Sequence, residues 1–327
     1  MKRFRAITGL AALALIPMLV LAACTAGGGA DAKSVDGHAP DMPALTIAMI
    51  THAAPGDTFW DIIRKGAESA AAKDNVKLLY SSDPDAGRQA QLVQQAIDQK
   101  VDGIAVTLAK PDALKDVLAK ATAAGIPFVA FNAGSDSAIG FGAITYFGQE
   151  EKIAGEAVGS KLLADGYTHP ICMIQEQGHV GLEARCAGVK EKVPGTEILY
   201  VVGTDMTQVS STLTAKLQAT KDADVVVGLG APFTLAAVKA VADVGSKAKV
   251  ASFDMNADLA QQIADGKVIF TVDQQPYLQG YESIDSLWLY NRGLFKIGGG
   301  QSVLTGPTIV TPEDAKPILK FAKEGIR

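Results

Sequence analysis

Short apolar runs alternate with amphipathic stretches along most of the chain, and this alternation predicts its secondary structure. In the first half, the apolar runs lie at 45–51, 76–82, 103–108 and 127–132, and the helical patterns between them lie at 58–73, 88–99 and 111–124. Within the second of these helical patterns, Leu92, Val93, Ala96 and Ile97 recur at the spacing of one helix face.

The second half repeats this rhythm. Its apolar runs lie at 171–175, 198–203, 225–230, 250–254 and 268–273, and its helical patterns lie at 179–193, 207–220, 233–244 and 257–265. Runs that are apolar at nearly every position indicate strands that are buried on both faces. We therefore expect an α/β fold in which parallel sheets are covered by helices on both sides.

The two halves also echo each other. In the first half, an apolar run begins at Asp102, a helix ends at Gly125 and a second apolar run follows at 127–132. In the second half, an apolar run begins at Asp224, a helix reaches Gly245 and a second apolar run ends at residue 254. Both later runs end in phenylalanine followed by a short polar residue. Because the offset between the copies is the size of a domain, we expect two similar Rossmann-like lobes.

The N-terminal segment has the pattern of a targeting signal. Three basic residues (Lys2, Arg3 and Arg5) precede the uncharged apolar stretch 7–23, which is typical of a secretory signal peptide. Its end, Leu-Ala-Ala-Cys at 21–24, resembles the lipobox of bacterial lipoproteins. The alternative is a membrane anchor, since the stretch is close to the minimum of about 17 residues that spans a bilayer. We expect 1–23 to be a lipoprotein signal peptide, Cys24 to be lipidated, and the glycine- and alanine-rich segment 24–43 to be a flexible tether.

Composition narrows the class of protein. The chain has 327 residues and a net charge of −5, and loss of the leader would remove three basic residues and no acidic one. A mildly acidic chain without a basic cluster argues against a nucleic-acid partner. The length after the leader suits about two domains, and no second apolar run reaches membrane-spanning length.

Besides Cys24, the chain has two cysteines, Cys172 and Cys186. A pair of cysteines outside the cytoplasm is a candidate disulfide. Cys172 lies about 10 Å before the end of its predicted strand, and Cys186 lies about 10 Å into the following helix. A helix that folds back on its strand brings them to a similar height, so we expect a disulfide; two buried free thiols are the alternative.

Polar and aromatic side chains gather where the predicted strands end, and ligands of open α/β sheets bind beyond those ends. The residues in such positions are Thr51, His52, Asp57, Phe59, Trp60, Ser81, Ser82, Asp83, Thr107, Asn132, Glu176, Gly230, Asp254, Asn256, Asp273 and Gln274. Carboxylates and amides bind hydroxyl groups, and an aromatic ring covers the C–H face of a sugar. The set therefore predicts a neutral, polyhydroxylated ligand.

Signals for catalysis are weak. The four histidines lack metal-ligand spacing, and the sequence has no cysteine cluster, nucleophile elbow, P-loop or complete dinucleotide fingerprint. A pair of strand-end carboxylates could serve glycoside hydrolysis, although Asp57 and Asp83 precede helices, where they can act as N-caps. We therefore expect a binding protein that needs no cofactor and no metal.

From about Leu45 to the C-terminus, the chain resembles the type I periplasmic sugar-binding proteins, the ribose- and galactose-binding group. The resemblance rests on Thr58-Phe59-Trp60 at the start of the first helix, on the stretches 102–114, 124–132 and 250–276, and on the helix that follows. It implies two lobes that are joined by a three-strand hinge and close over a solute, which is then delivered to an ABC importer.

The resemblance also assigns site residues. Phe59 and Trp60 match the paired aromatics of the family; as neighbours on a helix they cannot both face one way, so we expect one to pack in the core. Arg185 matches the arginine that reaches the ring oxygens, Asp254 the aspartate that holds two hydroxyls, and Gln274 the glutamine at the lobe crossover. Two further positions complete the implied set: Asp57, where the family often has asparagine, and Thr107, near a family asparagine.

Three departures from the family pattern leave the sugar open. The family's Asp-Arg pair is Asn132-Ala133 here, and Gly230 stands where ribose-type members have asparagine. The segment 175–186 also differs from ribose-type loops, so we expect Glu176 and His179 to supply contacts instead.

These inferences combine into one expected organisation. The hinge should cross near 147–149, 274–276 and 300–302, with an N-terminal lobe of 44–148 plus 275–300 and a C-terminal lobe of 149–274 plus 301–327. The predicted function is that of a monomeric extracytoplasmic lipoprotein that binds a monosaccharide or polyol and passes it to the permease subunits of an ABC importer. A sugar-sensing lipoprotein that presents its ligand to a membrane receptor is the alternative hypothesis, and a glycosidase is the third.

Overall fold

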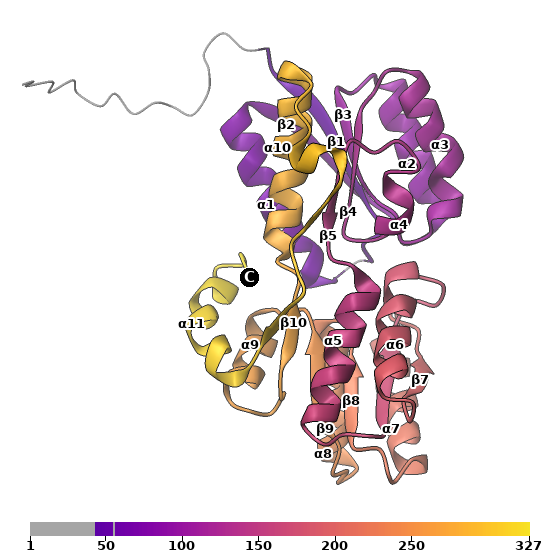
Figure 1. Cartoon of the computed structure of the whole chain (residues 1–327), viewed down its shortest axis with the longest axis vertical. Coiled ribbons are helices and arrows are strands. Elements are labelled where there is room, and N and C mark those ends of the chain that lie inside the picture. The colour runs from indigo at the N-terminus through magenta and orange to yellow at the C-terminus, as the bar shows by residue number, and fades with distance from the viewer. Residues whose placement is uncertain (1–42, 55) are drawn as a thin grey trace, which may run out of the picture. The chain divides into compact units, whose positions relative to one another are not determined.

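The computed structural model describes residues 43–54 and 56–327 (Figure 1). The predicted signal peptide, the lipidation site Cys24 and the tether up to residue 42 lie outside the described residues. In the described part of the chain, no helix combines the length and the apolar character that a membrane span requires.

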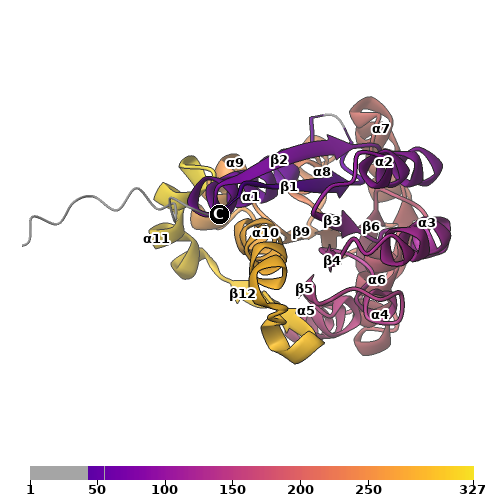
Figure 2. The same ribbon diagram turned by 90° about the horizontal axis from the view of Figure 1, so that it is seen from above.

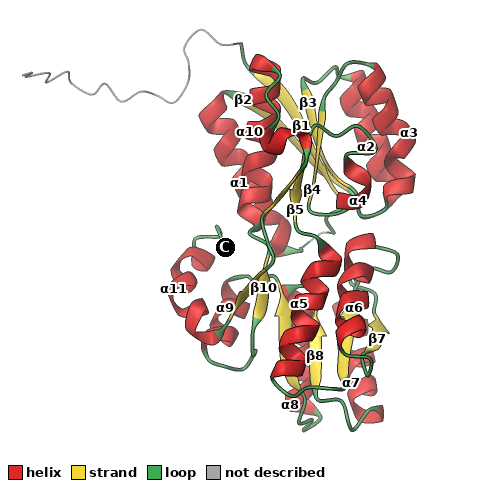
Figure 3. Ribbon diagram, viewed as in Figure 1, coloured by secondary structure: helices red, strands yellow, loops and turns green. Residues whose placement is uncertain are grey.

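The first sheet has six parallel strands in the order β11-β5-β4-β3-β1-β2. Figure 3 shows β1 to β5 of this sheet lying between helices. The strands are β1 (Leu45–Thr51), β2 (Val76–Ser82), β3 (Gly103–Thr107), β4 (Phe128–Phe131), β5 (Tyr146–Gly148) and β11 (Ser302–Leu304). One face packs on α1 (Thr58–Asp74) and α10 (Pro276–Gly293), and the other on α2 (Ala86–Asp98) and α3 (Pro111–Ala123) (Figure 2). The short α4 (Ser135–Ala138) follows β4.

The second sheet has the same plan, with the strand order β12-β10-β9-β8-β6-β7. Its strands are β6 (Pro170–Ile174), β7 (Glu197–Tyr200), β8 (Val225–Gly228), β9 (Lys249–Phe253), β10 (Thr271–Asp273) and β12 (Thr308–Val310). One face packs on α5 (Glu151–Ala164) and α6 (Val180–Lys192), and the other on α7 (Met206–Ala219), α8 (Ala231–Asp243), α9 (Ala257–Ala264) and α11 (Pro312–Lys323). The edge strand β12 runs antiparallel to β10. The predicted α/β fold with two similar lobes is therefore confirmed.

The chain passes between the two sheets three times. Two passages, at 149–150 and 274–275, lie at or next to the expected hinge positions. The third passage lies at 305–307 rather than at 300–302, because residues 302–304 first pair with β5 of the first sheet. Strand β10 begins at Thr271, later than the apolar run 268–273 predicted. The backbone N–H of Ile269 still donates to Val250 O (2.8 Å).

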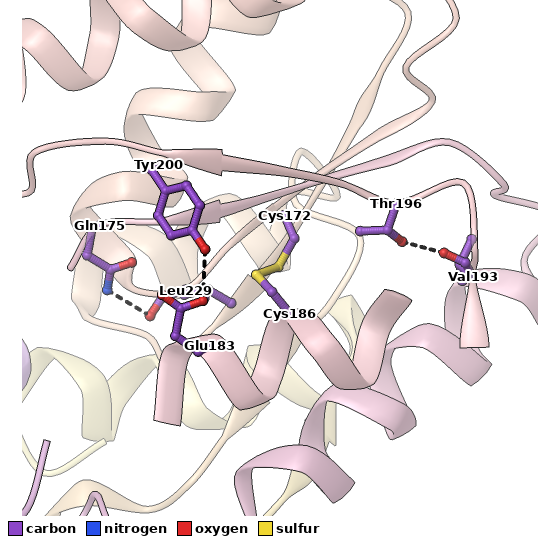
Figure 4. Close-up of a disulfide and its surroundings, with 8 residues drawn as sticks. All are labelled: Cys172, Gln175, Glu183, Cys186, Val193, Thr196, Tyr200 and Leu229. Carbon is purple, nitrogen blue, oxygen red and sulfur yellow. Dashed lines mark hydrogen bonds between the residues drawn. A yellow bond between two sulfur atoms is a disulfide. The ribbon is translucent and has the colours of Figure 1, made fainter. Parts of the chain in front are cut away.

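Cys172 and Cys186 form the predicted disulfide, with their Cα atoms 5.8 Å apart (Figure 4). The bond joins β6 to α6 across 14 residues of chain. Closing a loop of this length in the unfolded chain stabilises the fold by about 3 kcal/mol. It also fixes the helix that carries Arg185, the neighbour of Cys186 in the sequence.

Candidate functional site

A cavity of about 510 Å³ lies where the strands of both sheets end. Its walls come from the segments that follow β1 to β4 in the first sheet and β6 to β10 in the second. Nine of the ten site residues expected from the sequence line it: Asp57, Phe59, Trp60, Asn132, Glu176, His179, Arg185, Asp254 and Gln274. The tenth, Thr107, is fully buried behind His52, whose backbone N–H donates to the Thr107 hydroxyl (3.1 Å).

A chain of side-chain amides links the two sheets at the hinge end of the cavity. Asn132 Nδ2 donates to Gln274 Oε1 (3.2 Å), and Gln274 Nε2 donates to Asp254 Oδ1 (2.7 Å). Asn132 and Asp254 have φ angles of 66° and 62°, in the left-handed region that asparagine and aspartate tolerate better than most residues. This shared conformation explains why a short polar residue follows each of these two strands.

Arg185 is held by a two-pronged ion pair. Its Nε and Nη2 donate to the two carboxylate oxygens of Glu151 at 2.5 and 2.9 Å, and both side chains are buried. Glu151 also accepts from Gln149 Nε2 (2.9 Å). The remaining nitrogen, Nη1, lies 3.7 Å from Asp254 Oδ2, too far for a hydrogen bond, so its N–H groups are available to a ligand.

Asp254 sits at the centre of these groups. Burial raises the pKa of Asp254 to about 7, against the opposing effects of Arg185 and of the hydrogen bond from Gln274. A ligand that donates hydrogen bonds to the carboxylate stabilises its charged form. Asp254 therefore offers a carboxylate acceptor to the hydroxyl groups of a ligand.

Two histidines connect the lobes on another wall. His179 Nδ1 accepts from the backbone N–H groups of Gly181 (3.1 Å) and Leu182 (3.4 Å), so its proton is on Nε2, which donates to His52 Nε2 (3.1 Å). The proton of His52 is then on Nδ1, which donates to Thr107 Oγ1 (2.7 Å). Burial lowers the pKa of His52 to about 3 and that of His179 well below its usual value, so both rings are neutral.

These two histidines and Glu176 place possible metal-ligand atoms within 4.8 Å of one another. The donor set does not suit a metal. A ligating histidine normally donates its second ring N–H to an acceptor, whereas Nδ1 of His179 faces two backbone donors. Glu176 instead pairs with Lys110 Nζ (2.9 Å).

The aromatic wall is formed by Phe59 and Trp60 at the start of α1. Asp57 caps this helix, because its Oδ1 accepts from the backbone N–H of Phe59 (3.1 Å). Trp60 is buried in the core of the first lobe and Phe59 is half-buried, and the two rings meet edge to face with centroids 5.2 Å apart. Both rings line the cavity, and Trp60 also belongs to the core.

Some residues of the site were not singled out from the sequence. Glu151 holds Arg185, and Gln279 Nε2 donates to Gln274 Oε1 (2.9 Å) and so orients that side chain. Both are buried polar residues near the ends of helices that follow a sheet crossing, and this position is the only signal that the sequence offered. The apolar part of the wall, which includes Tyr200, Met206 and Phe233, had no signal of its own.

Comparisons with known proteins agree with this geometry. A family described as the periplasmic binding protein domain matches residues 47–294. The xylose/arabinose-binding protein XylF of Sulfolobus acidocaldarius is 26% identical over 275 residues, which are 78% of this chain and 68% of that protein. The ribose import binding protein RbsB of Bacillus subtilis is 24% identical over 233 residues, which are 68% of this chain and 74% of that protein.

A solved structure is closer in sequence than either. The crystal structure of a carbohydrate transporter from Acidothermus cellulolyticus 11B, in complex with myo-inositol, is 51% identical, with a TM-score of 0.86 over 87% of this chain and 100% of that one. The family match spans most of the described chain. Because members of this family bind solutes without catalysing a reaction, the hypothesis of a glycosidase is excluded. The chain therefore belongs to the type I periplasmic binding proteins of the sugar-binding group, the extracytoplasmic solute-binding proteins of ABC transporters.

Proposed function

We propose that this protein binds a cyclic polyol of the myo-inositol class between its two lobes and delivers it to the permease subunits of an ABC importer. One observation carries the proposal: Asp254, the free Nη1 of Arg185 and the amides of Asn132 and Gln274 converge on one end of the cavity. The 51% identical transporter structure that contains myo-inositol supports the same ligand class.

A neutral ring with many hydroxyl groups fits the charges of this site. The cationic side chains in the wall are already paired, Arg185 with Glu151 and Lys110 with Glu176, so no anionic ligand is needed to neutralise them. Hydroxyl groups can donate to Asp254 and accept from Arg185 at the same time. The aromatic wall can cover the C–H face of the ring.

A thermal-shift screen of residues 26–327 tests the ligand class. We expect myo-inositol to raise the melting temperature, since a ligand at 100 times its Kd stabilises the folded state by about 2.7 kcal/mol. Pentoses, hexoses and furanosides form the comparison panel, and acyclic mannitol is the control for non-specific polyol effects. A larger shift with a pentose or hexose would replace the cyclitol by that sugar, and no shift with any compound would exclude the whole class.

We also propose that Cys24 carries a lipid that keeps the protein at the membrane surface beside its permease. The lipobox-like end of the apolar leader supports this anchor. We expect the protein to incorporate radiolabelled palmitate in bacterial cells and Cys24→Ser to abolish the label. Cys172→Ser is the matched control and should keep the label, whereas a labelled Cys24→Ser protein would exclude the anchor.

A further inference from the structure

The cavity extends well beyond the groups that can bind one polyol ring. Its wall in the second lobe follows five neighbouring strand ends, from Gln274 after β10, past Asp254, Gly230 and Gln175, to Val202 after β7. Neighbouring strands lie about 4.8 Å apart, so this row is about 19 Å long. Asp254 and Gln274 lie at the β10 and β9 end, and the rest of the row is longer than a single ring can fill.

The far end of the cavity has a group of apolar side chains beside the polar Thr204 and Gln208. Tyr200, Val202 and Met206 line it and remain 44%, 53% and 40% exposed, next to the buried ring of Phe233. Ala54 and Pro84 line the cavity from the opposite lobe. Apolar side chains grouped in this way at the mouth of a ligand site indicate that something apolar covers them.

The loop that presents these side chains is fixed by hydrogen bonds. Val201 N donates to Ile174 O (2.9 Å), Gly203 N to Gln175 O (3.0 Å), and Val202 N to Gln208 Oε1 (3.0 Å). The hydroxyl of Tyr200 donates to Glu183 Oε2 (2.9 Å), which holds its ring in place (Figure 4). The exposure of Tyr200 and Val202 is therefore a built feature of the wall and not the result of a loosely held loop.

Gly230 leaves the passage between the two ends open. Its φ of −179° is extended backbone, which any residue can adopt, so the conformation does not require glycine. A Cβ at this position would lie 3.2 Å from Phe233 Cδ2 and 3.6 Å from Gln175 Nε2, within the row of strand ends. The absence of a side chain keeps the polar and the apolar ends of the cavity continuous.

We propose that the ligand is an O-substituted polyol, whose ring occupies the Asp254 end and whose substituent lays an apolar face on Tyr200, Val202, Met206 and Phe233. The substituent is joined through an ether or glycosidic oxygen that passes Gly230. This inference rests on the proposed function, since the ring must occupy the hydroxyl-binding end.

Isothermal titration with myo-inositol and with its O-methyl and O-benzyl ethers at each ring position tests the inference. We expect at least one O-benzyl ether to bind about tenfold more tightly than myo-inositol, because the benzyl group buries apolar surface, and the matching O-methyl ether to gain little. If myo-inositol binds and every benzyl ether binds more weakly, the inference is wrong and the proposed function stands. If neither the ring nor any ether binds, the proposed function fails, and the inference fails with it.

Two variants locate the effect, read as the ratio of the Kd values for myo-inositol and the best benzyl ether in the same protein. Val202→Asp and Gly230→Asn should each bring this ratio close to one; Asn is a favoured residue at a helix N-cap, so the start of α8 should tolerate it. Ile153→Asp is the matched control, since Ile153 is 56% exposed on α5 outside the cavity, and it should keep the wild-type ratio. A wild-type ratio in both cavity variants would overturn the inference.

Discussion

Asp254→Asn should lower the affinity for the polyol by at least about 100-fold, because the carboxylate of Asp254 lies in the cavity beside Arg185 Nη1 and the amide of Gln274. A hydrogen bond to a charged group contributes about 1.5–3 kcal/mol, and two hydroxyl groups on one carboxylate together correspond to a factor of about 100 or more. Isothermal titration of the wild type and the variant measures the change.

The control for this variant lies four residues away. Asp258, in the first turn of α9, is exposed and does not line the cavity, so Asp258→Asn should keep the wild-type affinity. The ligand-free Asp254→Asn protein should melt no lower than the wild type at pH 8, since the ionised carboxylate is the form that burial disfavours. An affinity within tenfold of the wild type would remove Asp254 from the site.

The same residue should make binding depend on pH. The pKa of Asp254 is about 7 without ligand, and hydroxyl donors favour the ionised form, so the ligand-bound protein has a lower pKa. Affinity should then be full above pH about 8 and fall by up to tenfold per pH unit below 7, until the pKa of the complex is reached. Asp254→Asn should show no such decline, and a wild-type affinity that is flat between pH 8 and 5 would contradict this assignment.

Part of the site was predictable because the grouping of residues within each lobe follows from the geometry of parallel sheets. Carboxyl ends of parallel strands meet at one edge of each sheet, so Thr107 and Asn132 could be placed together at the edge of the first sheet, and Asp254 and Gln274 at the edge of the second. The contact between His52 and His179, in contrast, depends on how one lobe meets the other. Hydrophobic patterns carry no information on that arrangement.

Helix α5 was missed for a physical reason. Glycine is a poor helix former, and α5 contains Gly155 and Gly159 on its buried face. A Cβ on Gly155 would lie 2.1 Å from the backbone oxygen of Arg185, so glycine is needed for α5 and α6 to approach. Without this helix in view, Glu151 had no position, and the partner of Arg185 could not be identified from the sequence.

The ion pair between Arg185 and Glu151 leads to the second large expected effect, a loss of folding stability. Arg185→Met should lower the free energy of unfolding by about 3–5 kcal/mol, because it leaves the buried carboxylate of Glu151 without its counter-charge. Urea unfolding followed by circular dichroism measures the change. Lys239→Met is the matched control; it breaks the exposed ion pair with Asp243 and should change the free energy by less than about 1 kcal/mol.

The double variant Arg185→Met/Glu151→Gln separates the structural role of Arg185 from its role in binding. Removing both charges takes away the stranded carboxylate, so the double variant should recover most of the stability that Arg185→Met loses. It should not recover affinity, because Nη1 of Arg185 is the group that the geometry offers to the ligand. If affinity returned together with stability, Arg185 would act only by neutralising Glu151, and the ligand would have to be held by Asp254 and the amides alone. If neither affinity nor stability returned, the ion pair would stabilise the contact between α5 and α6 through its hydrogen bonds as well as through charge neutralisation.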